Sequence, residues 1–224
     1  DWSKAIIACQ ELGELQGRPR CKELAHFHCE LAEEALRLKN QEVAAQHIGL
    51  AMDAVPNHPR ATILKGDLLV SQDKLSEAVD VWSYIYQHHV AYLPLVADRW
   101  MKVHQVLGKT DEALQILINA LQTQASGELL DITFRHVLAL RGNEAAETLM
   151  TDVMQHTPSL SAMALRSQAR LSLAEAAGDQ EKQVDIKASL GLLKQRTNSL
   201  ARYTCGNCGF RARRFYWQCP GCNA

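Results

Sequence analysis

The sequence lacks several features that would assign it directly to a class of protein. It contains no run of about 18 apolar residues, so we expect no segment of it to span a membrane. Its formal net charge is only -1, which gives no global electrostatic reason to bind nucleic acid or anionic lipid. It also contains no HExxH motif, no Walker loop and no GxGxxG fingerprint. Any catalytic or nucleic-acid function would therefore depend on a local group of residues.

A disulfide framework is also missing, although the chain contains seven cysteines. Cys9, Cys21 and Cys29 are scattered through sequence with helical periodicity, and three cysteines cannot all pair with one another in disulfides. Because no secretory signal is present either, the cysteines favour a reducing, cytosolic compartment. The chain opens directly in an amphipathic pattern, DWSKAIIACQELGEL, with no helix start signal before it. We therefore expect Asp1 to lie inside a longer protein, with any targeting signal or anchor upstream of this stretch.

A repeat of about 34 residues runs through the first two thirds of the sequence. Ala44, Ala78, Ala113 and Ala146 follow one another at intervals of 34, 35 and 33 residues. Four positions after each alanine comes a bulky residue, which places the pair on one face of a helix. These bulky residues are Ile48, Trp82, Leu117 and Met150. The period and the pairing resemble the tetratricopeptide repeat, a helix-turn-helix unit with small residues at its tight contacts.

Other positions agree with this resemblance. Gly66 lies twelve residues before Ala78, where such repeats place a small residue in the first helix. Pro56 and Pro158 each lie twelve residues after an alanine of the series, at the break between repeats. Several consensus positions are replaced, so the repeat is degenerate.

The resemblance predicts an all-α fold, a right-handed tetratricopeptide-repeat solenoid with a small C-terminal rubredoxin-like metal-binding domain. We expect repeats over residues 1–158, with the first one partial, capping helices over 159–200, and the metal-binding domain over 201–224. The capping helices should break near Gly178, and the second should offer Val184, Leu190, Leu193 and Leu200 to the solenoid. Stacked helix pairs bury their core only against neighbours and leave a groove that typically binds protein.

The tail contains four cysteines in the pattern C-x2-C-x10-C-x2-C. Cys205, Cys208, Cys219 and Cys222 can converge tetrahedrally on one metal ion, a geometry that suits structural zinc or a single iron. About twenty residues cannot assemble a stable core by apolar burial alone, so the metal must supply the folding energy. Four thiolates leave no open coordination position, which argues against hydrolytic catalysis. The knuckles CGNCGF and CPGCN resemble those of rubredoxin and zinc ribbons, and rubredoxin resemblance favours iron.

Two other functions for this tail remain open at the sequence level. A rubredoxin-like iron would transfer electrons. Arg202, Arg211, Arg213 and Arg214 meet no acidic residue between 201 and 224 and lie near aromatic residues, so they could form a nucleic-acid surface. They are better explained as partners of the negative metal-thiolate centre.

Histidines and the remaining cysteines offer no clear site. We interpret His26, His28, His47, His104 and His136 as surface or groove residues. Cys29 and His26 have the spacing of a nucleophile and a base, but a packed cysteine is the better interpretation.

Tetratricopeptide repeats followed directly by such a tail resemble the lipopolysaccharide assembly protein B family of Gram-negative bacteria. The resemblance rests on AHFHCELAEEAL, DEALQILINALQ and the cysteine knuckles, and it covers essentially the whole chain. It implies the C-terminal part of a longer protein, which an N-terminal helix holds at the cytoplasmic face of the inner membrane. The stretch in hand would itself be soluble and would reach the membrane only through that anchor.

The family resemblance also implies a function. Its members are non-enzymatic adaptors that promote degradation of the LpxC deacetylase by the FtsH protease and so regulate lipopolysaccharide biosynthesis. The family's four metal ligands correspond to Cys205, Cys208, Cys219 and Cys222, holding one iron ion with zinc as a substitute. Protein partners are expected and nucleic acid is not. Neither the groove residues that contact a partner nor dimerisation follows from the sequence.

Overall fold

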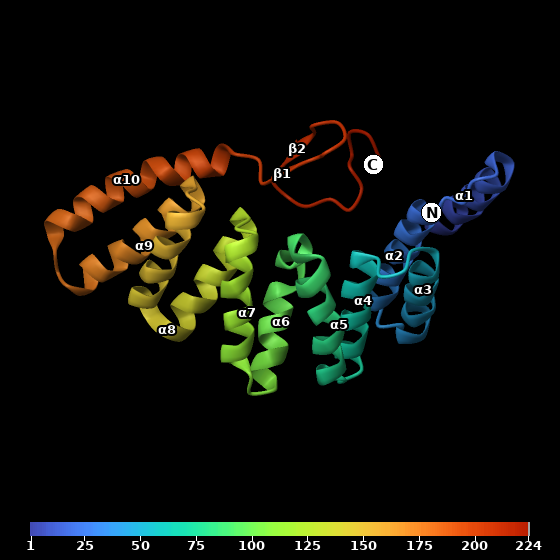
Figure 1. The fold of residues 1–224 in the computed structure, drawn as a ribbon, viewed down its shortest axis with the longest axis horizontal. Helices are drawn as coiled ribbons and strands as arrows, with labels where there is room; N and C mark the ends of the chain where they lie inside the picture. Colours follow the sequence, from blue (N-terminus) through green and yellow to red (C-terminus); the bar gives the residue numbers. More distant parts are fainter. Residues whose placement is uncertain (224) are drawn as a thin grey trace. The chain divides into compact units, whose positions relative to one another are not determined.

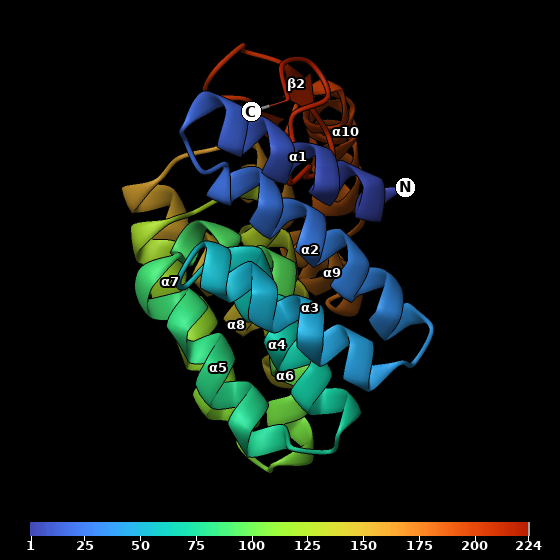
Figure 2. The same ribbon diagram turned by 90° about the vertical axis from the view of Figure 1, so that its right-hand side faces the viewer.

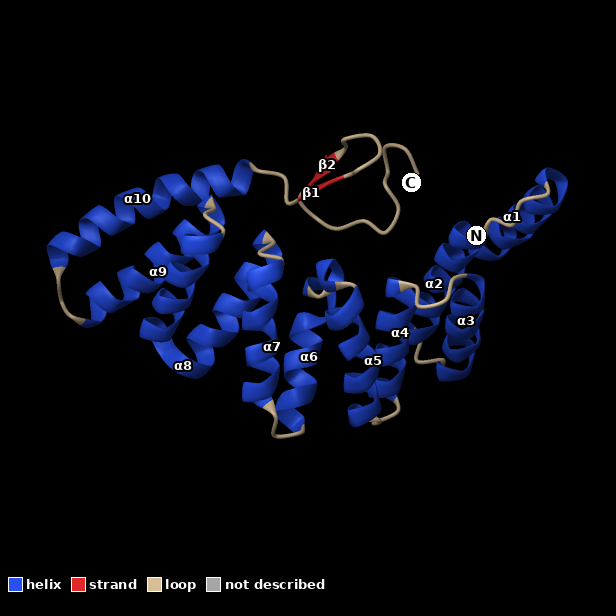
Figure 3. Cartoon of the chain, in the orientation of Figure 1, coloured by secondary structure: helices blue, strands red, loops and turns tan. Residues whose placement is uncertain are grey.

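The computed structural model describes residues 1–223, which form ten α-helices, one 3-10 helix and one two-stranded sheet. Contacts divide the chain into two compact units, Asp1–Gly108 and Lys109–Ala224. The helices of the first unit are α1 (Trp2–Gln16), α2 (Cys21–Arg37), α3 (Gln41–Ala54), α4 (Pro59–Ser71), α5 (Leu75–His88), η1 (Val90–Tyr92) and α6 (Pro94–Val106). Those of the second are α7 (Thr110–Thr123), α8 (Gly127–His156), α9 (Leu160–Ala176) and α10 (Gln180–Ser199). The fold is therefore all-α apart from the tail, as predicted (Figure 3).

The first unit consists of helix pairs, in which α2 packs on α3 and α4 packs on α5 (Figure 1). Small side chains occupy the contact between α2, α3 and α4, so the backbones approach closely. The buried residues of this contact are Ala25, Cys29, Ala32, Ala35, Ala44, Ile48, Ala51, Ala61, Leu64 and Leu68. The alanines and bulky residues predicted at the second helix of each repeat are buried, which includes Ala78 and Trp82 on α5. Figure 2 shows α2 and α3 lying side by side along their lengths.

Gly66 on α4 shows why the repeat needs a small residue there. A Cβ atom built on Gly66 would lie 2.0 Å from Nε1 of Trp82 on α5. The indole is fully buried, and its Nε1 donates a hydrogen bond to the carbonyl oxygen of Ile63 at 3.1 Å. Because the ring fills the space above the glycine, any larger residue would force α4 and α5 apart.

Ion pairs join the first helices of successive repeats. The buried guanidinium of Arg60 on α4 pairs with Glu30 and Glu33 of α2, each at 2.6 Å. Farther along α4, Asp67 pairs with Arg99 of α6. Burial raises the pKa of Asp67 to about 6, although Arg99 acts in the opposite direction. These pairs link α2, α4 and α6 through their charged faces.

Some expectations for the first unit were wrong. His104, expected at the surface or in a groove, is 1% exposed, and its Nδ1 lies 2.9 Å from the carbonyl oxygen of Trp100. Its ring also stacks on that of Trp100, so a hydrogen bond and an aromatic contact together allow the imidazole to be buried. His28 is also buried. The start of α1 does have a signal, because the side chain of Asp1 accepts a hydrogen bond from the N–H of Lys4.

In the second unit, α8 packs against α7 on one side and α9 on the other. The fourth repeat lies within α8, where Ala146 and Met150 are fully buried as predicted. Its two helices are joined without a loop, because the chain turns at Gly142, which has φ 80° and ψ -177°. This backbone conformation is almost restricted to glycine. A single residue therefore replaces the turn of the repeat.

The last two helices form a hairpin that breaks where the sequence predicted. Gly178 has φ 71°, and the side chain of Asp179 caps α10 by accepting from the N–H of Lys182 at 3.1 Å. The predicted buried face of α10 is only partly correct. Leu190 is buried, whereas Val184 and Leu200 are 66% and 45% exposed. None of the helices within residues 1–223 is both long and apolar enough to cross a membrane.

Candidate metal centre

A short hairpin begins the tail and presents the first pair of cysteines. Strand β1 (Tyr203–Thr204) pairs antiparallel with β2 (Arg211–Ala212). The pairing extends at both ends, because Arg202 N–H donates to Ala212 O at 2.9 Å and Cys205 N–H donates to Phe210 O at 2.8 Å. The loop of this hairpin is the first knuckle, and the second knuckle follows after Trp217.

The four sulfur atoms of the tail converge. They all lie within 4.8 Å of one another, with Sγ–Sγ distances of 3.8 Å between Cys205 and Cys222 and 3.6 Å between Cys208 and Cys219. In a regular tetrahedron with metal–sulfur bonds of about 2.3 Å, the sulfurs would be about 3.8 Å apart. The sulfurs thus fit one tetrahedral metal ion, and each knuckle contributes two of them.

The two knuckles have the same backbone form. Gly209 N–H donates to Cys205 O at 3.0 Å, and Asn223 N–H donates to Cys219 O at 2.8 Å. Both donors have left-handed backbone angles, with φ 75° at Gly209 and φ 57° at Asn223. Gly209 and Asn223 each directly follow the second cysteine of their knuckle in the sequence. Asparagine is the non-glycine residue that best tolerates this conformation, so the sequence carried a signal for Asn223 that was not used.

Gly221 allows the knuckles to approach each other. A Cβ atom on Gly221 would lie 3.4 Å from the Sγ of Cys208 and 3.4 Å from the Cβ of Phe210, both in or beside the first knuckle. Its N–H points to the Sγ of Cys219 at 3.4 Å, while the side-chain amide of Asn207 donates to the Sγ of Cys222 at 3.4 Å. Such N–H donors stabilise thiolates at metal centres.

The ionisation of the thiols shows why the cluster needs a cation. The backbone N–H groups of Cys208 and Asn207, with the neighbouring thiol of Cys219, lower the pKa of Cys205 to about 6. The N–H of Phe210 lowers the pKa of Cys208, but contacts with the other sulfurs, Cys222 first among them, outweigh this and raise it to about 12. Four thiolates at these distances repel one another, so full deprotonation requires a metal ion at their centre.

Comparisons with known proteins agree with this geometry. A family model described as the rubredoxin metal binding domain matches residues 203–224. Lipopolysaccharide assembly protein B of Escherichia coli (strain K12) is 28% identical over 228 residues, which cover 100% of this chain. Lipopolysaccharide assembly protein B of Haemophilus influenzae is 21% identical over 222 residues, or 99% of the chain. These similarities support a relationship of the chain to the lipopolysaccharide assembly protein B family.

The chain spans little more than half the length of these relatives, 57% of the Escherichia coli protein and 55% of the Haemophilus influenzae protein. The similarity extends through both the helical repeats and the cysteine tail. The chain therefore combines a four-cysteine metal-binding site with an all-α scaffold.

Aromatic side chains support the hairpin beside the metal centre. Phe215 contacts Trp217 edge to face with ring centroids 4.8 Å apart, and Tyr203 packs on Phe215 at 5.5 Å. Phe210 and Tyr216 are more than a third exposed. So small an apolar cluster cannot hold the tail folded without the metal.

The other sequence candidates do not form a site. Cys29 is fully buried, and burial raises the pKa of its thiol to about 12, so it is a packed side chain and a poor nucleophile. His26, its proposed base, lies beside Arg60 and Glu30. Among the arginines of the tail, Arg214 lies over the ring of Tyr216 at 4.7 Å, so this cation contacts an aromatic ring instead of the sulfur cluster.

Proposed function

We propose that this protein is a member of the lipopolysaccharide assembly protein B family and acts as a non-enzymatic adaptor that regulates lipopolysaccharide biosynthesis. In the full-length protein it would act at the cytoplasmic face of the inner membrane, where it would promote degradation of the LpxC deacetylase by the FtsH protease. The observation that supports this best is a closed four-cysteine centre on stacked helix pairs, in a chain that aligns over its whole length with proteins named for lipopolysaccharide assembly. Stacked helix pairs provide the extended surfaces to which proteins bind.

The site chemistry favours binding over catalysis. With Cys205, Cys208, Cys219 and Cys222 all bound to the metal, no position remains for a water or a substrate. Elsewhere, Cys29 is buried with a raised pKa, and the candidate His26 is engaged with charged neighbours. We therefore assign no catalytic residue.

We propose that the four cysteines hold one iron ion, for which zinc can substitute. The description of the matched model as a rubredoxin metal binding domain supports iron, and a sulfur tetrahedron suits either iron or zinc. We also retain the division into repeats over 1–158, capping helices over 159–200 and the metal-binding domain over 201–224.

The test compares two cysteine substitutions in the full-length protein. Cys205→Ser removes a metal ligand, whereas Cys21→Ser changes a half-buried cysteine at the start of α2 that is not one of the four metal ligands. The half-life of LpxC after translation is stopped, and the capture of LpxC and FtsH with the protein, are the measurements. We expect Cys205→Ser to lengthen the half-life several-fold and to lose capture, while Cys21→Ser behaves as the wild type. Normal capture and degradation by a metal-free Cys205→Ser protein would refute the adaptor role of the tail.

The rubredoxin match also supports electron transfer as a second candidate. The two functions differ in their response to the metal. An adaptor should keep LpxC degradation after iron is replaced by zinc, because both metals fix the same tetrahedron. An electron carrier should lose its function on that exchange, because zinc has no redox chemistry.

A further inference from the structure

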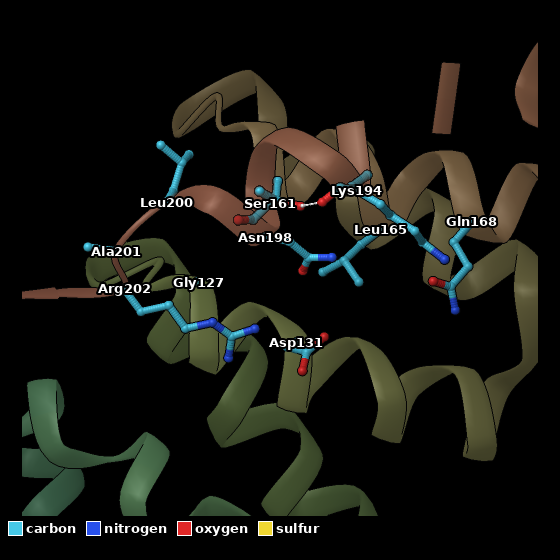
Figure 4. A pocket seen from close by; sticks show the side chains of 12 residues that line it. Gly127, Asp131, Ser161, Leu165, Gln168, Lys194, Asn198, Leu200, Ala201 and Arg202 are labelled. Carbon is cyan, nitrogen blue, oxygen red and sulfur yellow. Dashed lines mark hydrogen bonds between the residues drawn. The ribbon is translucent and has the colours of Figure 1, made fainter. Parts of the chain in front are cut away.

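A pocket of about 340 Å³ lies within the second unit, apart from the sulfur cluster. Helices α8, α9 and α10 and the segment that leads to β1 form its walls (Figure 4). The proposed adaptor function makes no use of it. Most of the side chains that line it are polar, and they come from parts of the chain that are far apart in sequence.

Two helix N-termini meet at one wall of the pocket. Gly127 is the first residue of α8, and Ser161 is the second residue of α9. A Cβ atom on Gly127 would lie 3.6 Å from the Oγ of Ser161, so the two termini are in contact. Ser126 and Ser159 cap the third N–H of their helices, which leaves the first N–H groups of each helix without an intrahelical acceptor. Both helix dipoles therefore place partial positive charge at this wall.

Two full positive charges reach the same space. Lys194 extends from the last turns of α10, and Arg202 extends from the segment before β1 (Figure 4). Within residues 1–223 neither side chain forms an ion pair, whereas cations elsewhere, such as Arg166 with Glu147 and Lys187 with Glu175 in the same unit, are paired with carboxylates. Asp131 on α8 is the single carboxylate among the lining residues. The charged side chains that line the pocket, Lys194, Arg202 and Asp131, thus sum to one excess positive charge.

We infer that this pocket binds a small polar solute that carries a phosphate group. The phosphate would accept charge-assisted hydrogen bonds from Lys194 and Arg202 and from the free N–H groups at the helix termini. Asp131, Asn198 and Gln168 would bind hydroxyl groups on the rest of the molecule. The volume lies at the lower end of the range for ligand sites, which suits a molecule the size of a monosaccharide phosphate.

Arg202 would link the pocket to the metal-binding tail. Its side chain lines the pocket, while its backbone N–H donates to Ala212 O of strand β2 at 2.9 Å. A bound phosphate would hold the side chain of Arg202, whose backbone already extends the β1–β2 hairpin. Ligand binding would therefore order the segment between α10 and β1.

The test measures binding of glucose 1-phosphate to the full-length, metal-loaded protein by titration calorimetry, with glucose and inorganic phosphate as comparison ligands. No client or protease is present, so the result is independent of the proposed adaptor function. We expect glucose 1-phosphate to bind and glucose not to bind. Lys194→Ala and Arg202→Ala should each raise its Kd by about tenfold or more, because each removes a charge-assisted hydrogen bond.

Two further variants make the test specific. Asp131→Asn should lower the Kd, because it removes the one carboxylate among the residues that line the pocket and so reduces repulsion of the phosphate. Arg213→Ala removes an exposed arginine that does not line the pocket, and it should leave the Kd unchanged. All of these positions are exposed or half-buried, so the variants should keep the far-UV circular dichroism of the wild type.

Three results would overturn the inference. The first is no binding of the sugar phosphate or of inorganic phosphate at millimolar concentration. The second is binding that falls equally in Arg213→Ala and in Arg202→Ala, since that would mean general attraction to exposed cations. The third is binding to phosphatidylglycerol vesicles without binding to soluble phosphates, since the ligand would then be a membrane surface.

Discussion

Individual glycines decide how closely the helices and the knuckles approach. Gly66 faces a buried indole, and Gly221 faces a ligand sulfur of the other knuckle. Gly49, by contrast, lies in α3 with nothing within 4 Å of a Cβ atom. Replacement of glycine by alanine should therefore change the stability of the protein in opposite directions at Gly66 and at Gly49.

Gly66→Ala should destabilise the protein by about 1–3 kcal/mol, because the new methyl group overlaps the ring of Trp82. The indole cannot turn away without breaking its hydrogen bond to Ile63. Gly49→Ala is the matched control and should stabilise by about 0.5–1 kcal/mol, because alanine favours the helix. Urea unfolding followed by circular dichroism measures both changes. Equal effects at the two positions would show that the Gly66–Trp82 contact does not limit helix packing.

Sequence patterns predicted the residues that recur at a fixed spacing. They did not predict the burial of residues that depend on a contact formed only in the folded chain. The alanines of the repeat, Gly66 and the four cysteines follow from spacing alone. The burial of His104 does not, because it depends on the stacked ring and the carbonyl of Trp100, and both are features of the folded helix. Asn223 was missed although it follows Cys222 as Gly209 follows Cys208, and the matching hydrogen bonds of the fold make the equivalence plain.

At the scale of elements, the sequence predicted helices well and predicted their connections less well. The repeat implied a turn before Ala146, whereas the chain passes through Gly142 with no loop. Small residues recur with the same period whether the two helices are joined by a turn or directly at Gly142, so the pattern cannot distinguish these two connections. The exposed positions on α10 were missed because its apolar residues do not follow one face consistently.

Gly142→Ala should lower the free energy of unfolding by about 1–3 kcal/mol, because φ 80° with ψ -177° is strained for any residue with a Cβ atom. No atom lies within 4 Å of the added methyl group, so the cost is conformational and not a clash. Gly191→Ala, in the ordinary helix α10, is the control and should be neutral or stabilising. Urea unfolding again gives the comparison. An unchanged free energy in Gly142→Ala would mean that α8 can straighten without loss of packing.

The contact between α2 and α3 includes two histidines whose protonation opposes folding. Nδ1 of His28 lies 3.1 Å from Nδ1 of His47, and the rings stack. Burial lowers the pKa of both rings, and the second ring adds to this at His28. Since the unfolded chain binds these protons more readily, this part of the stability is complete above pH 6.5 and is lost as the pH falls below it.

The wild type should therefore lose stability between pH 7 and pH 5.5, with at most about 1.4 kcal/mol per pH unit for each proton taken up on unfolding. His47→Gln should show a smaller loss over the same range, because it removes one titrating ring and the neighbour of the other. Asp67 acts in the opposite direction near pH 6, since its pKa is raised, but it is common to both proteins. Urea unfolding at several pH values measures the difference. Parallel pH profiles would exclude the pair as a source of pH dependence.

At the scale of the whole molecule, the tail and the helices owe their stability to different forces. The helices bury apolar side chains between repeats, whereas the tail has only a few aromatic contacts and depends on the metal. The loss of the metal should therefore be a local event.

Removing the metal should abolish hydrogen-exchange protection over residues 203–223 and leave that of α2 to α5 unchanged. The metal contributes on the order of 10 kcal/mol to the folding of such small domains, which exceeds what the tail can obtain by burial. Exchange measured by mass spectrometry, with and without a chelator, tests this. Cys205→Ser should reproduce the effect of the chelator, and Cys21→Ser should not. Loss of protection in α2 to α5 as well would mean that the metal stabilises the helices directly.

The four sulfurs differ in how far solvent reaches them. Cys208 is exposed, Cys205 and Cys222 are half-buried, and Cys219 is buried. A chelator that competes for a bound ion would therefore reach the thiolate of Cys208 first. Release of the ion would then depend on how often that exposed bond opened, while the buried thiolate of Cys219 would favour recapture.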